Sequence, residues 1–115
     1  MAETDWVKEL PSAVTVCGAD GIILSMNNRS IKAFEEDGGE ALIGTNVLDC
    51  HPEPARSKLA AMLQSGVANT YTIQKKGKKK LIHQSPWYHD GVYSGFVEIS
   101  IELPDPMQHF NRDAQ

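Results

Sequence analysis

The sequence of 115 residues has little of what several protein classes require. It contains only two cysteines, Cys17 and Cys50, and no CxxC spacing, so two reduced thiols in a reducing compartment are expected rather than a disulfide framework. The four histidines show no paired ligand spacing with these cysteines, and no zinc site is predicted. No apolar run approaches the roughly 18 residues of a membrane span. The acidic N-terminus is unlike a signal peptide, and we expect a cytoplasmic protein that does not enter a membrane.

Catalytic motifs are absent as well. The sequence has no paired carboxylates, no glycine-rich phosphate loop and no metalloprotease signature. Asp49, Cys50 and His51 are contiguous, but adjacent side chains diverge and cannot form the hydrogen-bonded relay that activates a thiolate. We therefore predict that the protein is not an enzyme. A small α+β enzyme remains the less favoured alternative, and it requires a carboxylate or histidine that faces a pocket.

Positive charge is concentrated in one stretch. Five of the 11 basic residues lie between Lys75 and Lys80, and the rest of the chain carries an excess of its 15 acidic residues. Such a surface repels nucleic acid, so we expect no nucleic-acid partner. The lysine stretch predicts a solvated hairpin turn, with a docking loop for an acidic partner as the alternative.

The hydrophobic pattern predicts one α+β domain, since strand patterns lie at both ends of the chain and helix patterns lie between them. A hydrophobic content of 41% is sufficient for a small core. The helix after Asn27 or Asn28 is expected to end at Gly38, and Pro52 and Pro54 are expected in the first turn of the next helix. The strands are expected at Ala13–Cys17, Ile22–Met26, around Tyr71 and Ile73, at Leu81–Tyr88 and at Val97–Leu103.

The last strand shows the clearest alternation in the sequence. Apolar residues alternate there with Glu98, Ser100 and Glu102, which predicts one core face and one polar face. The row expected to face the core is Val97, Ile99, Ile101 and Leu103. Two apolar residues of the tail, Met107 and Phe110, are expected to dock back as a short amphipathic turn.

Three segments in this order resemble the PAS family. Asp20–Asn27 resembles the family's Asp-Gly turn, apolar strand and Asn before the first helix. Ala41–Asp49, followed by His51 and Pro52, is similar to its Leu-Ile-Gly segment and His-Pro helix start. Asp90–Val97 resembles its Asp-Gly turn and final strand.

The resemblance implies a five-stranded antiparallel sheet that curls around a small cavity, with the central helices packed on one face. It implies a PAS-type signalling module that senses a small ligand or mediates protein–protein interaction. It also implies a homodimer formed through the outer sheet face and the N-terminal helix, and an unidentified signalling protein as a partner. On this basis residues 1–11 are an N-terminal capping helix, 12–103 the PAS-like domain and 104–115 a tail. The domain is either free-standing or excised from a larger sensor.

Candidate ligand-binding residues follow from the aromatic, methionine and polar positions of these elements, although packing in a core gives the same pattern. The dimer surface is expected at Trp6, Val7 and Leu10, because a helix too short to be stable alone must bury its apolar side. The alternative is packing of that helix on its own sheet. The candidate pocket residues are Met26, Asn27, Phe34, His51, Met62, Tyr71, Gln84, Trp87, Tyr93 and Phe96.

The cofactor remains unknown from the sequence. Light-sensing relatives carry a reactive cysteine directly after Gly-x-Asn, and this chain has Val47 there, so flavin adduct chemistry is excluded. Haem is an alternative, because imidazole is a good iron ligand and some haem-binding PAS domains take their axial histidine from the region of His51. Without haem, no metal is expected and His51 caps its turn. His83 is expected to be a structural histidine on a strand.

Overall fold

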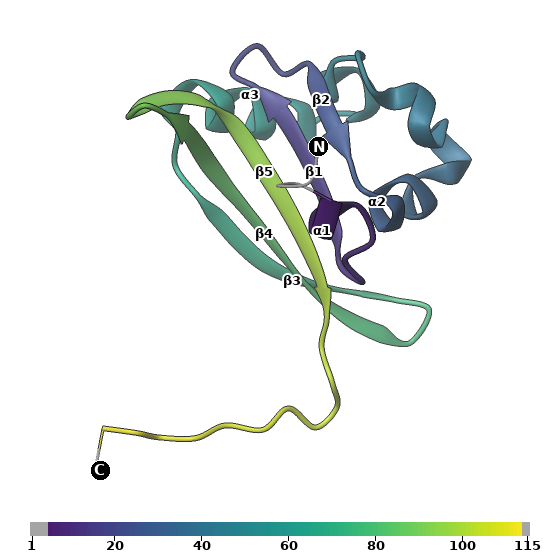
Figure 1. Cartoon of the computed structure of the whole chain (residues 1–115), viewed down its shortest axis with the longest axis vertical. Coiled ribbons are helices and arrows are strands. Elements are labelled where there is room, and N and C mark those ends of the chain that lie inside the picture. The colour runs from purple at the N-terminus through teal and green to yellow at the C-terminus, as the bar shows by residue number, and fades with distance from the viewer. Residues whose placement is uncertain (1–4, 114–115) are drawn as a thin grey trace.

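The computed structural model describes residues 5–113, and these contain one sheet of five antiparallel strands in the order β2-β1-β5-β4-β3 (Figure 1). The first two strands therefore join the last three through the β1–β5 pairing, as the resemblance implied. This single sheet is the framework on which the site is built. The strands are β1 (Ala13–Gly18), β2 (Ile23–Met26), β3 (Asn69–Lys75), β4 (Lys78–His89) and β5 (Val92–Glu102).

The helices lie mainly between β2 and β3 in the chain. They are α1 (Asp5–Lys8), α2 (Asn28–Ala33), the 3-10 turns η2 (Glu35–Asp37), η3 (Gly39–Leu42) and η4 (Val47–Cys50), and α3 (Ala55–Ser65).

The end of α2 and the start of α3 differ from the prediction. Helix α2 ends at Ala33 and not at Gly38, since the acidic residues that follow it as η2 would be unfavourable at the negative end of a longer helix. Helix α3 begins after Pro54 rather than including both prolines. The residue before a proline avoids helical backbone angles, which delays the start of the helix.

The side chain of Asn27 connects three segments near the N-terminus. Its Oδ1 accepts hydrogen bonds from the backbone N–H of Ser30, at 3.0 Å, and of Val14, at 2.9 Å. Its amide nitrogen donates to the carbonyl oxygens of Val7 and Ser12, at 3.0 and 2.8 Å. Asn27 is only 3% exposed, so this residue caps α2 and also fixes the path of α1 and β1.

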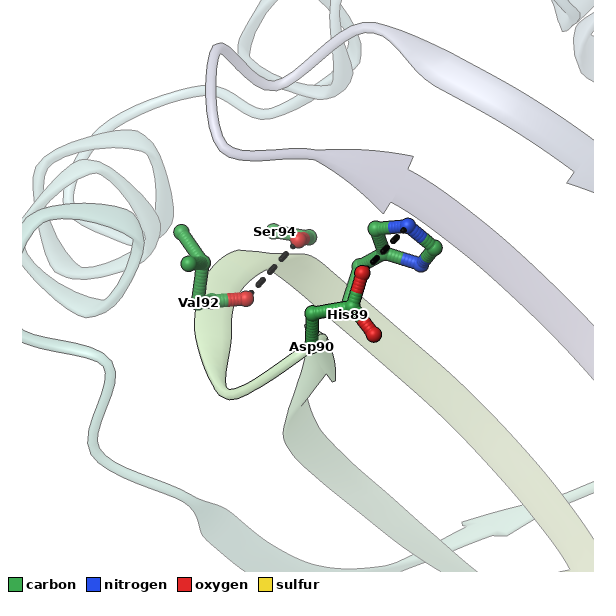
Figure 2. A network of polar contacts seen from close by, with 4 residues as sticks. All are labelled: His89, Asp90, Val92 and Ser94. Atoms are coloured by element: carbon green, nitrogen blue, oxygen red, sulfur yellow. Dashed lines mark hydrogen bonds and ion pairs between the residues drawn. The ribbon is translucent and has the colours of Figure 1, made fainter.

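Two tight turns join the last three strands, as predicted. The turn between β3 and β4 places Lys76 and Gly77 at positive φ, and the turn between β4 and β5 does the same with Asp90 and Gly91. Such turns match the twist of paired strands. Figure 2 shows the second turn, where the Ser94 hydroxyl donates to the Val92 carbonyl at 2.9 Å and His89 lies 3.3 Å from the Asp90 carboxylate. The lysine hairpin is exposed at its tip.

The prediction for β5 was wrong about which of its faces meets the helices. Phe96 is 5% exposed and packs with Cys17 and Leu63, and Glu98 lies on the same face because strand side chains alternate. Ile101 is 40% exposed on the opposite face. The row Val97, Ile99, Ile101 and Leu103 is therefore not the core face, although Val97, between Phe96 and Glu98, also borders the cavity described below.

A β-bulge also changes which residues of β5 share a face. Trp87 pairs with Gly95, but Tyr88 pairs with Tyr93, so Ser94 is an extra residue in β5. An extra residue shifts the alternation by one position. Tyr93 and Phe96 consequently both pack toward the helices, although they are three positions apart. Without the bulge, alternation would place them on opposite faces of the sheet.

The tail beyond β5 does not dock back on the domain. Met107 and Phe110 are 61% and 66% exposed, and residues 103–112 contain no helix and extend away from the sheet (Figure 1). Pro104 and Pro106 lack the backbone N–H that a helical turn uses, which disfavours the expected amphipathic turn. No helix within residues 5–113 is long and apolar enough to cross a membrane.

Candidate functional site

A cavity of about 180 Å³ lies between the sheet and the central helices. Strands β1, β2, β4 and β5 form its floor, and η2, η3, η4 and α3 contribute to its walls. The lining is mostly apolar, with carboxylate, amide, hydroxyl, thiol and imidazole groups among it. The lining residues are Thr15, Cys17, Ile23, Met26, Phe34, Asp37, Leu42, Val47, His51, Leu59, Met62, Gln84, Phe96, Val97 and Glu98.

Six of the ten candidate pocket residues line this cavity. They are Met26, Phe34, His51, Met62, Gln84 and Phe96.

The other four candidates lie elsewhere. The side-chain amide of Asn27 forms the hydrogen bonds to backbone groups described above. Tyr71 is 40% exposed on edge strand β3. The indole N–H of Trp87 donates to the carbonyl oxygen of Cys17 at 3.0 Å. The hydroxyl of Tyr93 donates to the carbonyl oxygen of Leu63 at 2.7 Å. Trp87 and Tyr93 therefore hold strands and α3 together.

Glu98 is the main lining residue that the sequence did not indicate. Its Oε2 accepts a hydrogen bond from Nε2 of Gln84 at 2.8 Å, and Oε1 of Gln84 accepts one from Asn69 at 3.3 Å. These three residues are directly opposite one another on β5, β4 and β3. The chain of amides orients the carboxylate of Glu98 beside the cavity. Gln84 was the only part of this arrangement that the sequence suggested.

Cys17 supplies a buried thiol to the same cavity. Burial raises the pKa of this thiol, and the charges of Asp20 and Glu98 raise it further, against the opposing effect of a hydrogen bond from the backbone of Phe96. A raised pKa keeps the thiol protonated and makes it a poor nucleophile. Burial and the charge of Glu98 also raise the pKa of Tyr71, which agrees with a position on the same sheet face as Glu98.

The strand order and the position of the helices can be compared with solved structures. The PAS domain of BvgS from Bordetella pertussis aligns with a TM-score of 0.68 and 12% identity, over 91% of this chain and 86% of that one. The PAS domain of an HTR-like protein from Haloarcula marismortui aligns with a TM-score of 0.61 and 14% identity, over 89% of both chains. The chain has a PAS-like fold. No family model and no curated protein matches the sequence.

A third similar structure is that of the Aer2 receptor from Vibrio cholerae, described as a dual PAS-heme oxygen sensor. It aligns with the PAS-like domain at a TM-score of 0.59 and 16% identity, over 81% of this chain and 95% of that one. At this level of identity the three similarities establish the fold, and they assign no ligand to this protein.

Haem does not fit the cavity of this PAS-like domain. The cavity volume is about 180 Å³. Pockets that enclose drug-sized ligands have volumes of roughly 300–1,000 Å³, and a haem is at least as large as such a ligand. His51 lines the cavity, and its Nδ1 lies 2.6 Å from the Val47 carbonyl oxygen, so its ring caps the turn that η4 forms. Among the side chains that the structure describes, no group of three or more could hold a metal ion.

The cavity does contain the carboxylates and the histidine that an enzyme would require. Asp37, His51 and Glu98 all line it. Within the part of the chain that the structure describes, no hydrogen bond joins His51 to either carboxylate.

The predicted dimer surface on α1 is partly accessible. Trp6 is 65% exposed, whereas Val7 and Leu10 are half-buried. The carbonyl of Val7 is the group held by Asn27. The short helix is thus anchored to its own domain through the backbone while the indole of Trp6 projects into solvent.

Proposed function

We propose that this PAS-like domain is a signalling module that dimerises through the outer face of its sheet and accepts a small ligand in its cavity. The single observation that carries the proposal is that the two faces of the sheet differ in their surroundings. One face lines the cavity. The other faces away from the central helices and carries neighbouring apolar residues on β1, β4 and β5.

The outer face is built from strands β1, β4 and β5. In the strand pairing, Val14 lies opposite Ile99, and Ile101 lies opposite Leu81. Ile101 is 40% exposed, and the other three are half-buried. Soluble monomers seldom leave several neighbouring apolar side chains accessible, and such patches are typical of interaction surfaces. A second copy of the chain offers the same apolar surface, so this face supports a symmetric dimer.

The two faces share their strands. Glu98 borders the cavity, and the next residue in β5, Ile99, belongs to the outer face. A ligand that moves the backbone at Glu98 therefore also moves the proposed interface. The free energy by which a ligand can shift the equilibrium between two dimer arrangements equals the difference in its binding free energy to them.

A matched pair of variants tests the interface. Ile101→Glu places a charge on the outer face, and Ile43→Glu places one in the loop after η3. The wild-type side chains are 40% and 38% exposed, so both changes impose similar costs on the monomer. We expect wild type and Ile43→Glu to be dimers by light scattering at micromolar concentration, and Ile101→Glu to be a monomer.

Trp6→Glu provides a second comparison with Val92→Glu, since these side chains are 65% and 66% exposed. If the helix takes part in the interface, Trp6→Glu weakens dimerisation and Val92→Glu does not. A wild-type protein that is monomeric in these measurements would refute the dimer, whatever the cavity binds.

A further inference from the structure

The charge of the cavity lining indicates what kind of molecule it binds. We infer that the cavity takes a small organic cation, an amine with an apolar body, whose ammonium group pairs with the carboxylate of Glu98. This inference rests on the proposed role of the cavity as a ligand site and adds the chemical class of the ligand.

The lining carries formal negative charge and no permanent positive charge. Glu98 and Asp37 are both lining residues, and no lysine or arginine is among them. Within residues 5–113, no basic side chain forms an ion pair with either carboxylate. Glu98 is half-buried and Asp37 is exposed, and a carboxylate that is partly removed from water is stabilised by a neighbouring opposite charge. A cationic ligand supplies that charge, and an anionic ligand would add to the repulsion.

The hydrogen bonds around Glu98 also favour a ligand that donates. The Gln84 amide donates to Oε2 of Glu98 at 2.8 Å, and it is the one side-chain donor to this carboxylate within the described residues. Thr15, directly opposite Glu98 on β1, is hydrogen-bonded through its hydroxyl to Ser30. An ionised carboxylate has about four acceptor positions, so Glu98 keeps positions that an ammonium group can fill.

The remaining lining suits the body of such a ligand. Phe34 and Phe96 present aromatic rings, and Met26 and Met62 present flexible thioether side chains. Aromatic faces attract cations, and methionine adapts to irregular shapes. If each non-hydrogen atom takes roughly half to all of the volume of one water, the cavity of about 180 Å³ holds on the order of six to twelve such atoms.

Three probes of nearly equal shape test the charge preference in the full chain. Phenethylamine is a cation at neutral pH, 2-phenylethanol is neutral and phenylacetate is an anion. We expect calorimetric titration to give phenethylamine an affinity about 10- to 100-fold above that of 2-phenylethanol, the gain typical of a hydrogen bond to a charged group. Phenylacetate should bind more weakly than either.

Two variants test the role of Glu98. Glu98→Gln should reduce the affinity for phenethylamine to that for 2-phenylethanol. Glu102→Gln removes the same charge from the same strand at a residue outside the cavity lining, and it should leave all three affinities unchanged. Circular dichroism establishes whether each variant is folded. The comparison of the three probes on wild type remains decisive even if Glu98→Gln does not fold.

The outcomes separate this inference from the proposed function. If phenylacetate or 2-phenylethanol binds as tightly as phenethylamine, the cavity is a ligand site but the cation assignment is wrong. If Glu102→Gln and Glu98→Gln weaken binding equally, the effect comes from net charge and Glu98 is not the recognition group. If none of the probes binds at millimolar concentration, the ligand-binding role of the cavity is refuted together with the inference, and the dimer remains to be judged by its own test.

Discussion

Gly95 lies at the bulge that decides which face of β5 meets the helices, and Gly95→Ala is the sharpest test of that arrangement. The backbone of Gly95 has a φ of +141°, and a Cβ atom there would lie 2.0 Å from the carbonyl oxygen of Cys17 and 2.7 Å from the carbonyl carbon of Gly18. All of these are backbone atoms of β1, the partner strand, so no side-chain rotation can relieve the contact.

The expected cost has two parts. An L-residue held at such a φ costs about 1–3 kcal/mol, and overpacking against backbone costs about another 1–3 kcal/mol. Together they amount to about 2–6 kcal/mol, a large part of the roughly 5–15 kcal/mol by which small domains are stable. Separation of β1 from β5 would also disturb the hydrogen bond of 3.0 Å from the Trp87 indole to the Cys17 carbonyl.

Gly44→Ala is the matched control. Gly44 also has a positive φ, +94°, but a Cβ atom there would meet nothing within 4 Å. This variant should show the backbone cost alone. In urea unfolding followed by tryptophan fluorescence, we expect the midpoint of Gly95→Ala to fall about 1 M below that of Gly44→Ala, with similar slopes. Equal midpoints for the two variants would show that β1 and β5 do not approach closely at Gly95, and would refute this reasoning.

Four further predictions concern other residues. Asn27→Asp replaces an amide that donates to two carbonyls by an oxygen that cannot donate, and should lower the unfolding free energy by about 2–5 kcal/mol; a loss below 0.5 kcal/mol would contradict its central role. Tyr93→Phe should cost about 1 kcal/mol in urea unfolding because it removes the bond to α3, whereas Tyr88→Phe, at a residue 58% exposed, should cost nothing measurable. Because the pKa of the Cys17 thiol is raised from 9.0, the protonated thiol contributes to stability below pH 9.0, and this contribution is lost as the pH rises through the higher folded value. In a Cys50→Ser background, the Cys17 thiol should react with a disulfide reagent far more slowly in the folded than in the unfolded protein. Haem added to the protein should keep the absorption spectrum of free haem, because the cavity is too small for it, and a shifted Soret band that depends on His51 would contradict this.

Much of the fold was predictable because local chemistry specified it. The Asp90-Gly91 and Lys76-Gly77 turns tolerate positive φ, and turns of this kind connect antiparallel strands regardless of the rest of the chain. Asn27 had the right chemistry for a helix cap, and the structure shows it as one. The sequence alone therefore determined the order of strands and helices, the central position of the helices and the resemblance to PAS domains.

The composition of the site was decided by tertiary structure. An alternating strand has two faces, and the sequence does not specify which of them the helices cover. The bulge at Ser94 shifts the alternation, and the packing of Phe96 on Leu63 selects the covered face. Glu98 consequently borders the cavity, although its alternation with apolar residues, together with Ser100 and Glu102, suggested a solvent-facing row.

The same limit applies to the candidate residues that lie outside the cavity. The sequence determined that Trp87 and Tyr93 are large aromatic residues on strands near the end of the domain. Their indole and hydroxyl groups are used by the carbonyls of Cys17 and Leu63, which lie 70 and 30 positions away in the chain. Contacts between such distant residues depend on how the sheet and helices pack together, because local patterns fix only the conformation of neighbouring residues. The sequence thus determined which elements form, and the packing of those elements decided which side chains line the cavity.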